Sequence, residues 1–115
     1  MVRRDEGEPY WRISIDEAND MIGEDGVQVI DVRQPDEWIA GRVSGAVHIP
    51  VDEVLSRMGE LESEKKLLFI CAAGVRSGLA GEMAAAMGVD PDRLYNIEDG
   101  TGPWIEKGYP TEYGA

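Results

Sequence analysis

The chain has 115 residues, of which 23 are acidic and 11 are basic, so its formal net charge is −12. This length fits one domain, and an acidic surface repels phosphate backbones, so no direct nucleic-acid partner is expected. With one cysteine and one histidine, the chain can form neither an intramolecular disulfide nor the usual zinc cage.

No segment has the properties of a membrane span or a secretion signal. The longest apolar run, residues 67–73, is far shorter than the roughly 18 residues that a spanning helix needs. The first residues lack the apolar core of a signal peptide. We therefore expect a soluble cytoplasmic protein without membrane contact, with residues 1–9 as a flexible acidic tail and residues 10–115 as a single domain.

Segments typical of strands and helices alternate along this domain. Ser14 and Glu17 form a capping-box pattern ahead of an apolar helical stripe. We expect strands at residues 12–13, 27–32, 44–50, 66–71 and 94–97, and helices at 15–22, 35–40, 51–58 and 77–87, with a last helical turn ending at 107. Helices alternating with strands that are apolar on both faces predict an α/β fold with a mainly parallel sheet. Ligands bind such sheets at the carboxyl ends of the strands.

The only cysteine, Cys71, stands at the carboxyl end of the most apolar of these strands. Backbone N–H groups at the start of the next helix lower the pKa of a thiol placed there, and the small residues between can curl into an anion-binding nest. Arg76 adds a cation at the rim or a brace for neighbouring carboxylates, and Ser77 is expected to open the helix. A buried, inert cysteine is the alternative. The small residues are Ala72, Ala73, Gly74 and Val75.

Three motifs together resemble the rhodanese-like domain, the family of single-domain sulfurtransferases. They are "DVRQPDEWIAGRVSGAVHIP" at residues 31–50, "CAAGVRSG" at 71–78 and "GPWIEKGYP" at 102–110. They occur in the family's order, and the resemblance extends over residues 13–110.

The resemblance implies a rhodanese-like fold, a five-stranded, mainly parallel sheet with helices on both faces. It implies a thiosulfate-type sulfurtransferase without a cofactor, in which Cys71 takes sulfane sulfur from a donor and holds it as a persulfide. The donor would be thiosulfate or a persulfide, and the acceptor a thiol, cyanide or a protein. Residues 71–76 match the family's six-residue loop, so the persulfide cradle would be Ala72, Ala73, Gly74, Val75 and Arg76, with Ser77 following.

Two other functions stay open. One is a catalytically idle rhodanese-like module that binds a partner or senses redox state. The other is a cysteine phosphatase or arsenate reductase, but these use a Cys-x5-Arg loop, whereas here Arg76 follows Cys71 at the shorter Cys-x4-Arg spacing. The chain departs from many rhodaneses in having Ala72 where a basic or polar residue is common. The family's closing motif usually carries two glycines before the tryptophan region, whereas this chain reads "DGTGPW".

Three residues are expected to support the site. Asp31 and Arg33 end a strand beside it and could tune the thiolate or touch substrate. We expect instead that Asp31 braces the fold by pairing with a cation such as Arg42, because a buried carboxylate needs a partner. His48 is expected to be a hydrogen-bonded structural residue and not a base.

Overall fold

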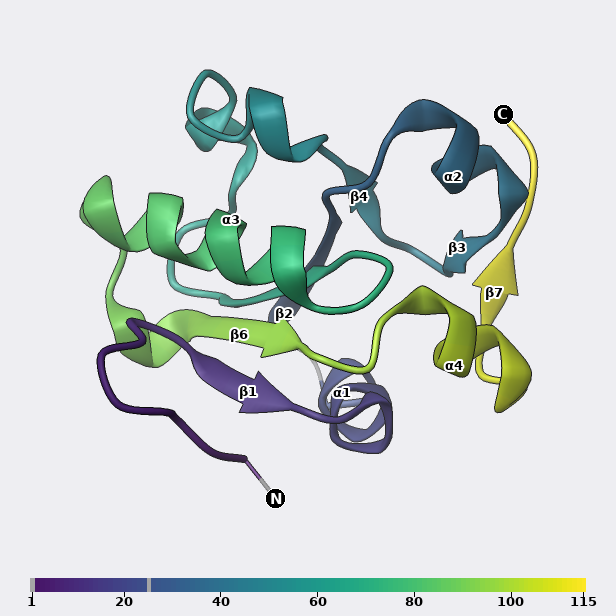
Figure 1. Cartoon of the computed structure of the whole chain (residues 1–115), viewed down its shortest axis with the longest axis horizontal. Helices are drawn as coiled ribbons and strands as arrows, with labels where there is room; N and C mark the ends of the chain where they lie inside the picture. Colours follow the sequence, from purple (N-terminus) through teal and green to yellow (C-terminus); the bar gives the residue numbers. More distant parts are fainter. Residues whose placement is uncertain (1, 25) are drawn as a thin grey trace.

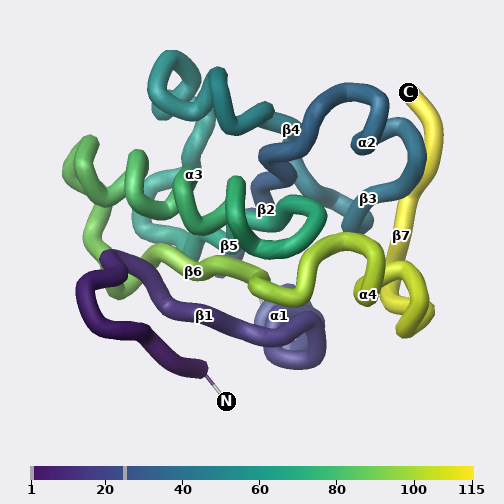
Figure 2. The backbone as a smooth tube through the Cα atoms, in the orientation of Figure 1, coloured from purple at the N-terminus to yellow at the C-terminus, as the bar shows by residue number. Residues whose placement is uncertain are grey.

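The computed structural model describes residues 2–24 and 26–115. Five parallel strands form the main sheet in the order β1-β6-β5-β2-β4, and Figure 2 shows β2, β5, β6 and β1 side by side. The α/β fold with a five-stranded parallel sheet is confirmed. The strands are β1 (Trp11–Ile13), β2 (Val27–Asp31), β4 (Val47–His48), β5 (Lys66–Ile70) and β6 (Leu94–Ile97).

Helices cover both faces of this sheet. On one face α3 (Val75–Ala86) packs with the short 3-10 turns η1 (Val51–Glu53) and η2 (Met58–Glu60), and Figure 1 shows α3 running alongside β6. On the other face lie α1 (Ile15–Ile22) and α4 (Thr101–Glu106). A further turn, η3 (Pro91–Arg93), precedes β6.

Strand β5 lies in the middle of the sheet and shows why the site forms where it does. Its side chains from Leu67 to Ile70 are fully buried, because neighbours on both sides and helices on both faces cover them. Leu67 and Phe69 point into the core under α3, and Leu68 and Ile70 point into the core under α1 and α4. The same alternation turns the next residue, Cys71, toward α3.

A second, two-stranded sheet was not expected from the sequence. Strands β3 (Arg42–Val43) and β7 (Thr111–Glu112) pair antiparallel, and α2 (Pro35–Ala40) lies beside them. Together they build the wall next to the carboxyl end of β2.

Three of the expected elements are wrong in detail. The expected strand at 44–50 pairs only through β4, and the expected helix at 51–58 is reduced to the turn η1 and the start of η2. The helix expected to open at Ser77 begins at Val75, because Gly74, with a φ of 87°, already forms its N-cap. Ser77 therefore lies within the first turn, where it is fully buried.

Residues near the amino terminus contact the sheet. Arg3 pairs with Arg12 through the backbone and with the carboxylate of Glu98, while Arg4 lies over the ring of Trp11. The flexibility expected of residues 1–9 stays a prediction. Within the described part of the chain, no helix is long and apolar enough to cross a membrane.

Candidate active site

Cys71 lies directly after β5 with its side chain inside the loop that leads to α3. The residue is 1 % exposed, whereas Ala72, Ala73 and Val75 are exposed. The loop thus surrounds the sulfur atom with backbone and leaves its own side chains outside. The left-handed conformation of Gly74 makes this reversal possible, and a Cβ there would stand 2.8 Å from the carbonyl oxygen of Glu98.

Several donors converge on the sulfur atom. The N–H of Gly74 donates to Sγ at 3.2 Å, and the Ser77 hydroxyl lies at 3.2 Å. Burial of the thiol raises its pKa, but hydrogen bonds from the Ser77 hydroxyl and from the N–H groups of Ser77, Ala73 and Gly74 together outweigh burial. The pKa of Cys71 therefore lies below its ordinary value, so this site stabilises the thiolate more than an ordinary cysteine environment does.

Behind Ser77 lies a residue that sequence reasoning missed. The Ser77 hydroxyl donates to Oδ1 of Asn96 at 2.6 Å, and Nδ2 of Asn96 donates to the Gly74 carbonyl at 3.0 Å. Asn96 is 1 % exposed and sits in β6 among apolar neighbours. A buried amide in such a strand requires partners, and this requirement was the available signal.

The closing sequence holds the loop from its other side. Both the N–H and the hydroxyl of Thr101 donate to the carbonyl oxygen of Cys71, at 3.0 and 3.1 Å. Gly100 approaches the loop so closely that a Cβ would stand 1.9 Å from the carbonyl oxygen of Ala72. Residues 100–101 therefore fix the backbone of the loop, a role that sequence analysis did not assign to them.

Arg76 braces a carboxylate. Its two terminal nitrogens donate to Glu37 of α2 at 2.7 and 2.9 Å. These hydrogen bonds hold the pKa of Glu37 at about 2, so the carboxylate stays charged and neutralises Arg76 throughout the physiological range. Of the two roles considered for Arg76, the brace matches these contacts.

The expected pairing of Asp31 with Arg42 is wrong. Asp31 is fully buried and pairs with Arg33, whose Nη2 lies 2.7 Å from the carboxylate, because Asp31 is the last residue of β2 and Arg33 follows it by two residues. Arg42 instead lies over the ring of Trp38 and donates to the carbonyl oxygens of Trp38 and Gly114. The structure therefore places Asp31 and Arg33 beside the loop and Arg42 on the outer side of α2.

His48 has the structural role expected of it. Its Nε2 donates to the carbonyl oxygen of Arg33 at 2.7 Å, and its ring stacks on Trp38 at 4.7 Å between centroids. It thereby fixes the backbone that carries Arg33.

Hollows flank the cysteine loop on two sides. One, of about 330 Å³, is lined by residues that include Arg33, Glu37, Ala72 and Thr101. The other, of about 490 Å³, lies under Gly74 and Val75 along α3. Both give small molecules access to the outside of the loop.

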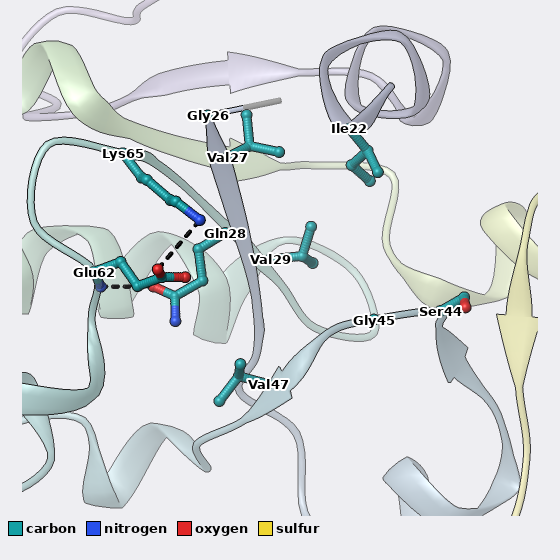
Figure 3. A pocket seen from close by; sticks show the side chains of 10 residues that line it. All are labelled: Ile22, Gly26, Val27, Gln28, Val29, Ser44, Gly45, Val47, Glu62 and Lys65. Atoms are coloured by element: carbon teal, nitrogen blue, oxygen red, sulfur yellow. Dashed lines mark hydrogen bonds and ion pairs between the residues drawn. The ribbon is translucent and has the colours of Figure 1, made fainter. Parts of the chain in front are cut away.

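A third hollow, of about 230 Å³, lies along the amino-terminal half of β2 (Figure 3). Gln28 points into it together with Glu62 and Lys65. None of the loop residues 71–77 lines it. Because this hollow lies away from Cys71, we do not include it in the candidate active site.

Comparison with known proteins agrees with this geometry. The family model described as "Rhodanese-like domain" matches residues 14–107. The uncharacterized protein YqhL of Bacillus subtilis is 34% identical over 77 residues, which are 67% of this chain and 60% of YqhL. This chain spans less than half the length of two further curated relatives.

Solved structures resemble it over most of its length. A rhodanese-related protein of Thermoplasma volcanium is 34% identical with a TM-score of 0.77, over 88% of this chain and 96% of that one. The human single-domain sulfurtransferase TSTD1 is 28% identical with a TM-score of 0.68, over 88% and 98% of the two chains. The match of the family model, joined with a parallel sheet that places Cys71 in a loop of converging donors, shows that this chain belongs to the rhodanese-like domain family.

Proposed function

We propose that this chain is a sulfurtransferase that carries sulfane sulfur as a persulfide on Cys71. The observation that supports it best is the set of groups around Sγ, comprising three N–H donors and the Ser77 hydroxyl at 3.2 Å. They stabilise a thiolate before sulfur arrives. After loading, the loop N–H groups can stabilise the negative charge on the terminal sulfur, as preorganised donors do in an oxyanion hole.

The reaction needs two displacements at sulfur. The Cys71 thiolate attacks the sulfane sulfur of the donor, an S–S bond forms on Sγ, and the donor's bond breaks, so that its electron pair leaves with the released group. With thiosulfate that group is sulfite. An acceptor thiolate or cyanide then attacks the terminal sulfur, and the bonding pair returns to Sγ as thiolate. No proton has to move in either step, so the reaction requires no general base.

The charges near the loop favour donors of low negative charge. Arg76 is neutralised by Glu37, Arg33 is neutralised by Asp31, and the chain as a whole carries −12. We therefore propose a persulfide-type or protein-bound donor in preference to the thiosulfate dianion. The rate constant kcat/KM for thiosulfate should rise between about 0.1 and 1 M salt, since the Debye length then shrinks from about 10 to 3 Å. It should rise less for benzenethiosulfonate, a monoanion.

The test compares sulfur transfer with two other chemistries in the wild type and in Cys71→Ser. We expect transfer to cyanide and to thiols that is lost in the variant, and no comparable turnover of an aryl phosphate or of arsenate. Cys71-dependent phosphatase activity that exceeds sulfur transfer would overturn the proposal. A wild type that transfers no sulfur from any donor would favour the idle binding module.

A further inference from the structure

The Ser77 hydroxyl, which lies beside the sulfur atom of Cys71, has a second possible hydrogen-bond acceptor in Asn96. Its side chain is buried between β6 and the start of α3, with Oδ1 2.6 Å from Ser77 Oγ and Nδ2 3.0 Å from the Gly74 carbonyl. On its other side, Ser77 Oγ lies 3.2 Å from Cys71 Sγ. Sulfur, hydroxyl and amide therefore form one chain of hydrogen bonds.

The direction of this chain follows from the chemistry of its ends. The Gly74 carbonyl can only accept, so the NH₂ group of Asn96 must face it and Oδ1 must face Ser77. Ser77 has a single hydroxyl hydrogen, and Oδ1 can only accept it. While Cys71 is a thiol, its S–H donates to Ser77, and Ser77 donates to Asn96.

Loss of the thiol proton creates a conflict at Ser77. A thiolate can only accept, so both neighbours of the hydroxyl now require the same hydrogen. Gly74 prevents Asn96 from resolving the conflict by turning its amide over, since two carbonyl oxygens would then face each other. Either the sulfur or the amide oxygen must give up the hydroxyl hydrogen.

We propose that Asn96 is a positioning residue that competes with the Cys71 thiolate for the single hydrogen of Ser77, and thereby sets how readily Sγ holds negative charge. The inference rests on the proposed sulfur transfer. During loading, charge leaves Sγ for the terminal sulfur, and the hydroxyl returns to Asn96. During discharge, charge returns to Sγ, and the hydroxyl rotates back toward it.

Three sets of ion pairs border the loop and stay constant in this comparison, and the exposed Glu82 of α3 lines the hollow beside Gly74 and Val75. Glu37 of α2 holds Arg76 of α3, and Asp31 holds Arg33 after β2. On the β6 side, Glu98 holds Arg3 and approaches Arg12. Substitution of the uncharged Asn96 or Ser77 removes none of these pairs.

The experiment is a pH titration of the thiolate by its ultraviolet absorbance, with the spectrum of Cys71→Ser subtracted to remove the tyrosines. Asn96→Leu frees the hydroxyl for sulfur and should lower the thiol pKa by about one unit. Ser77→Ala should raise it. In the Ser77→Ala background, Asn96→Leu should produce no further fall, because the competing hydrogen is gone.

Asn96→Asp provides a second variant of nearly unchanged shape, in case the leucine variant does not fold. A carboxylate accepts the hydroxyl more strongly, so it should raise the thiol pKa, and by less when Ser77 is alanine. A purely structural Asn96 would loosen the loop and raise the pKa in the leucine variant. That rise, or equal shifts with and without the Ser77 hydroxyl, would overturn the inference.

The titration requires no sulfur donor. A protein that transferred no sulfur would still show the competition, so failure of the inference and failure of the proposed function are distinguishable. As a kinetic check, discharge of a loaded Asn96→Leu variant should be faster than in the wild type, since a thiol of lower pKa leaves more readily.

Discussion

Polar groups at the two ends of the main sheet differ in their hydrogen-bond partners. At the amino end of β2, the Gln28 amide donates to the Glu60 carbonyl and accepts from the Glu62 N–H, and Lys65 pairs with Glu62 (Figure 3). These groups satisfy one another. At the carboxyl end of β5, backbone donors converge on one sulfur atom.

This difference separates a structural hollow from a reactive one. A polar group whose hydrogen-bond partners are fixed within the fold stabilises the fold. Few of its donors or acceptors remain free to bind a ligand. Donors aimed at an atom whose charge changes can do chemical work. Substitutions at the two ends should therefore separate transfer from stability.

The largest effect is expected at the contact between Gly100 and the cysteine loop. Gly100→Ala places a Cβ where the Ala72 carbonyl lies and forces a side chain into a φ of 86°. The loop must shift, and sulfur transfer should fall about 100-fold, with a stability loss on the order of 1 to 3 kcal/mol. Measured kcat and thermal unfolding test this.

Gly102→Ala is the matched control, since a Cβ there would meet nothing within 4 Å. It should retain wild-type transfer. Equal losses in both variants, or near-normal transfer in Gly100→Ala, would show that the close approach does not position the loop.

A second effect concerns the pH dependence of persulfide loading. The pKa of Cys71 lies below its ordinary value, so the loading rate should rise with pH and have its midpoint below the pH at which an ordinary thiol is half ionised. Ser77→Ala removes one donor to the thiolate and should move the midpoint upward by about one unit. Below the wild-type midpoint, loading should then be about tenfold slower. An unchanged midpoint would contradict the role of the hydroxyl.

A smaller effect is expected from the ion pair at the rim. Glu37→Gln leaves Arg76 as an uncompensated cation, so kcat/KM for thiosulfate should rise about fivefold at low salt. Stability should change by less than about 1 kcal/mol, because both side chains are roughly one third exposed. Steady-state kinetics with benzenethiosulfonate should show a smaller gain. A fall in kcat/KM for thiosulfate would mean that the Arg76–Glu37 ion pair supports transfer through its geometry and not through its effect on the local charge.

The smallest effect on transfer is expected at the amino end of the sheet. Gln28→Leu leaves the Glu60 carbonyl and the Glu62 N–H without their partner and should cost about 1 to 3 kcal/mol of stability. Transfer per folded molecule should not change. Lys65→Met removes only an exposed ion pair and should alter stability by less than about 0.5 kcal/mol. Loss of sulfur transfer in a folded Gln28→Leu variant would contradict the view that the amino end of β2 is structural and the carboxyl end of β5 is reactive.

Local patterns predicted the core of the fold well. The apolar run before Cys71 is the central strand β5, and the Ser14 and Glu17 pattern forms a capping box whose hydrogen bonds are 2.8 and 3.1 Å long. Both depend on neighbours in sequence, which explains why sequence alone was sufficient. The parallel sheet then placed Cys71 where two strands and a helix start meet.

Contacts between distant segments could not be predicted in the same way. Glu37 reaches Arg76 and Thr101 reaches Cys71 only because α2 and α4 approach the loop in space. Asp31 was expected to pair with a cation such as Arg42, but it pairs with Arg33, which lies only two residues further along the chain. The helix start was misplaced by two residues because a glycine in a left-handed conformation caps it, and serine is the commoner signal.

Intact mass spectrometry of the wild type after incubation with a sulfur donor tests the proposed persulfide most directly. The chain has one cysteine, so a gain of one sulfur atom can be assigned to Cys71. We expect that gain with benzenethiosulfonate or a persulfide donor, its reversal by cyanide or a thiol, and neither change in folded Cys71→Ser. Sulfur that is gained and released equally by Cys71→Ser, or a wild type that gains none from any donor, would contradict the proposal.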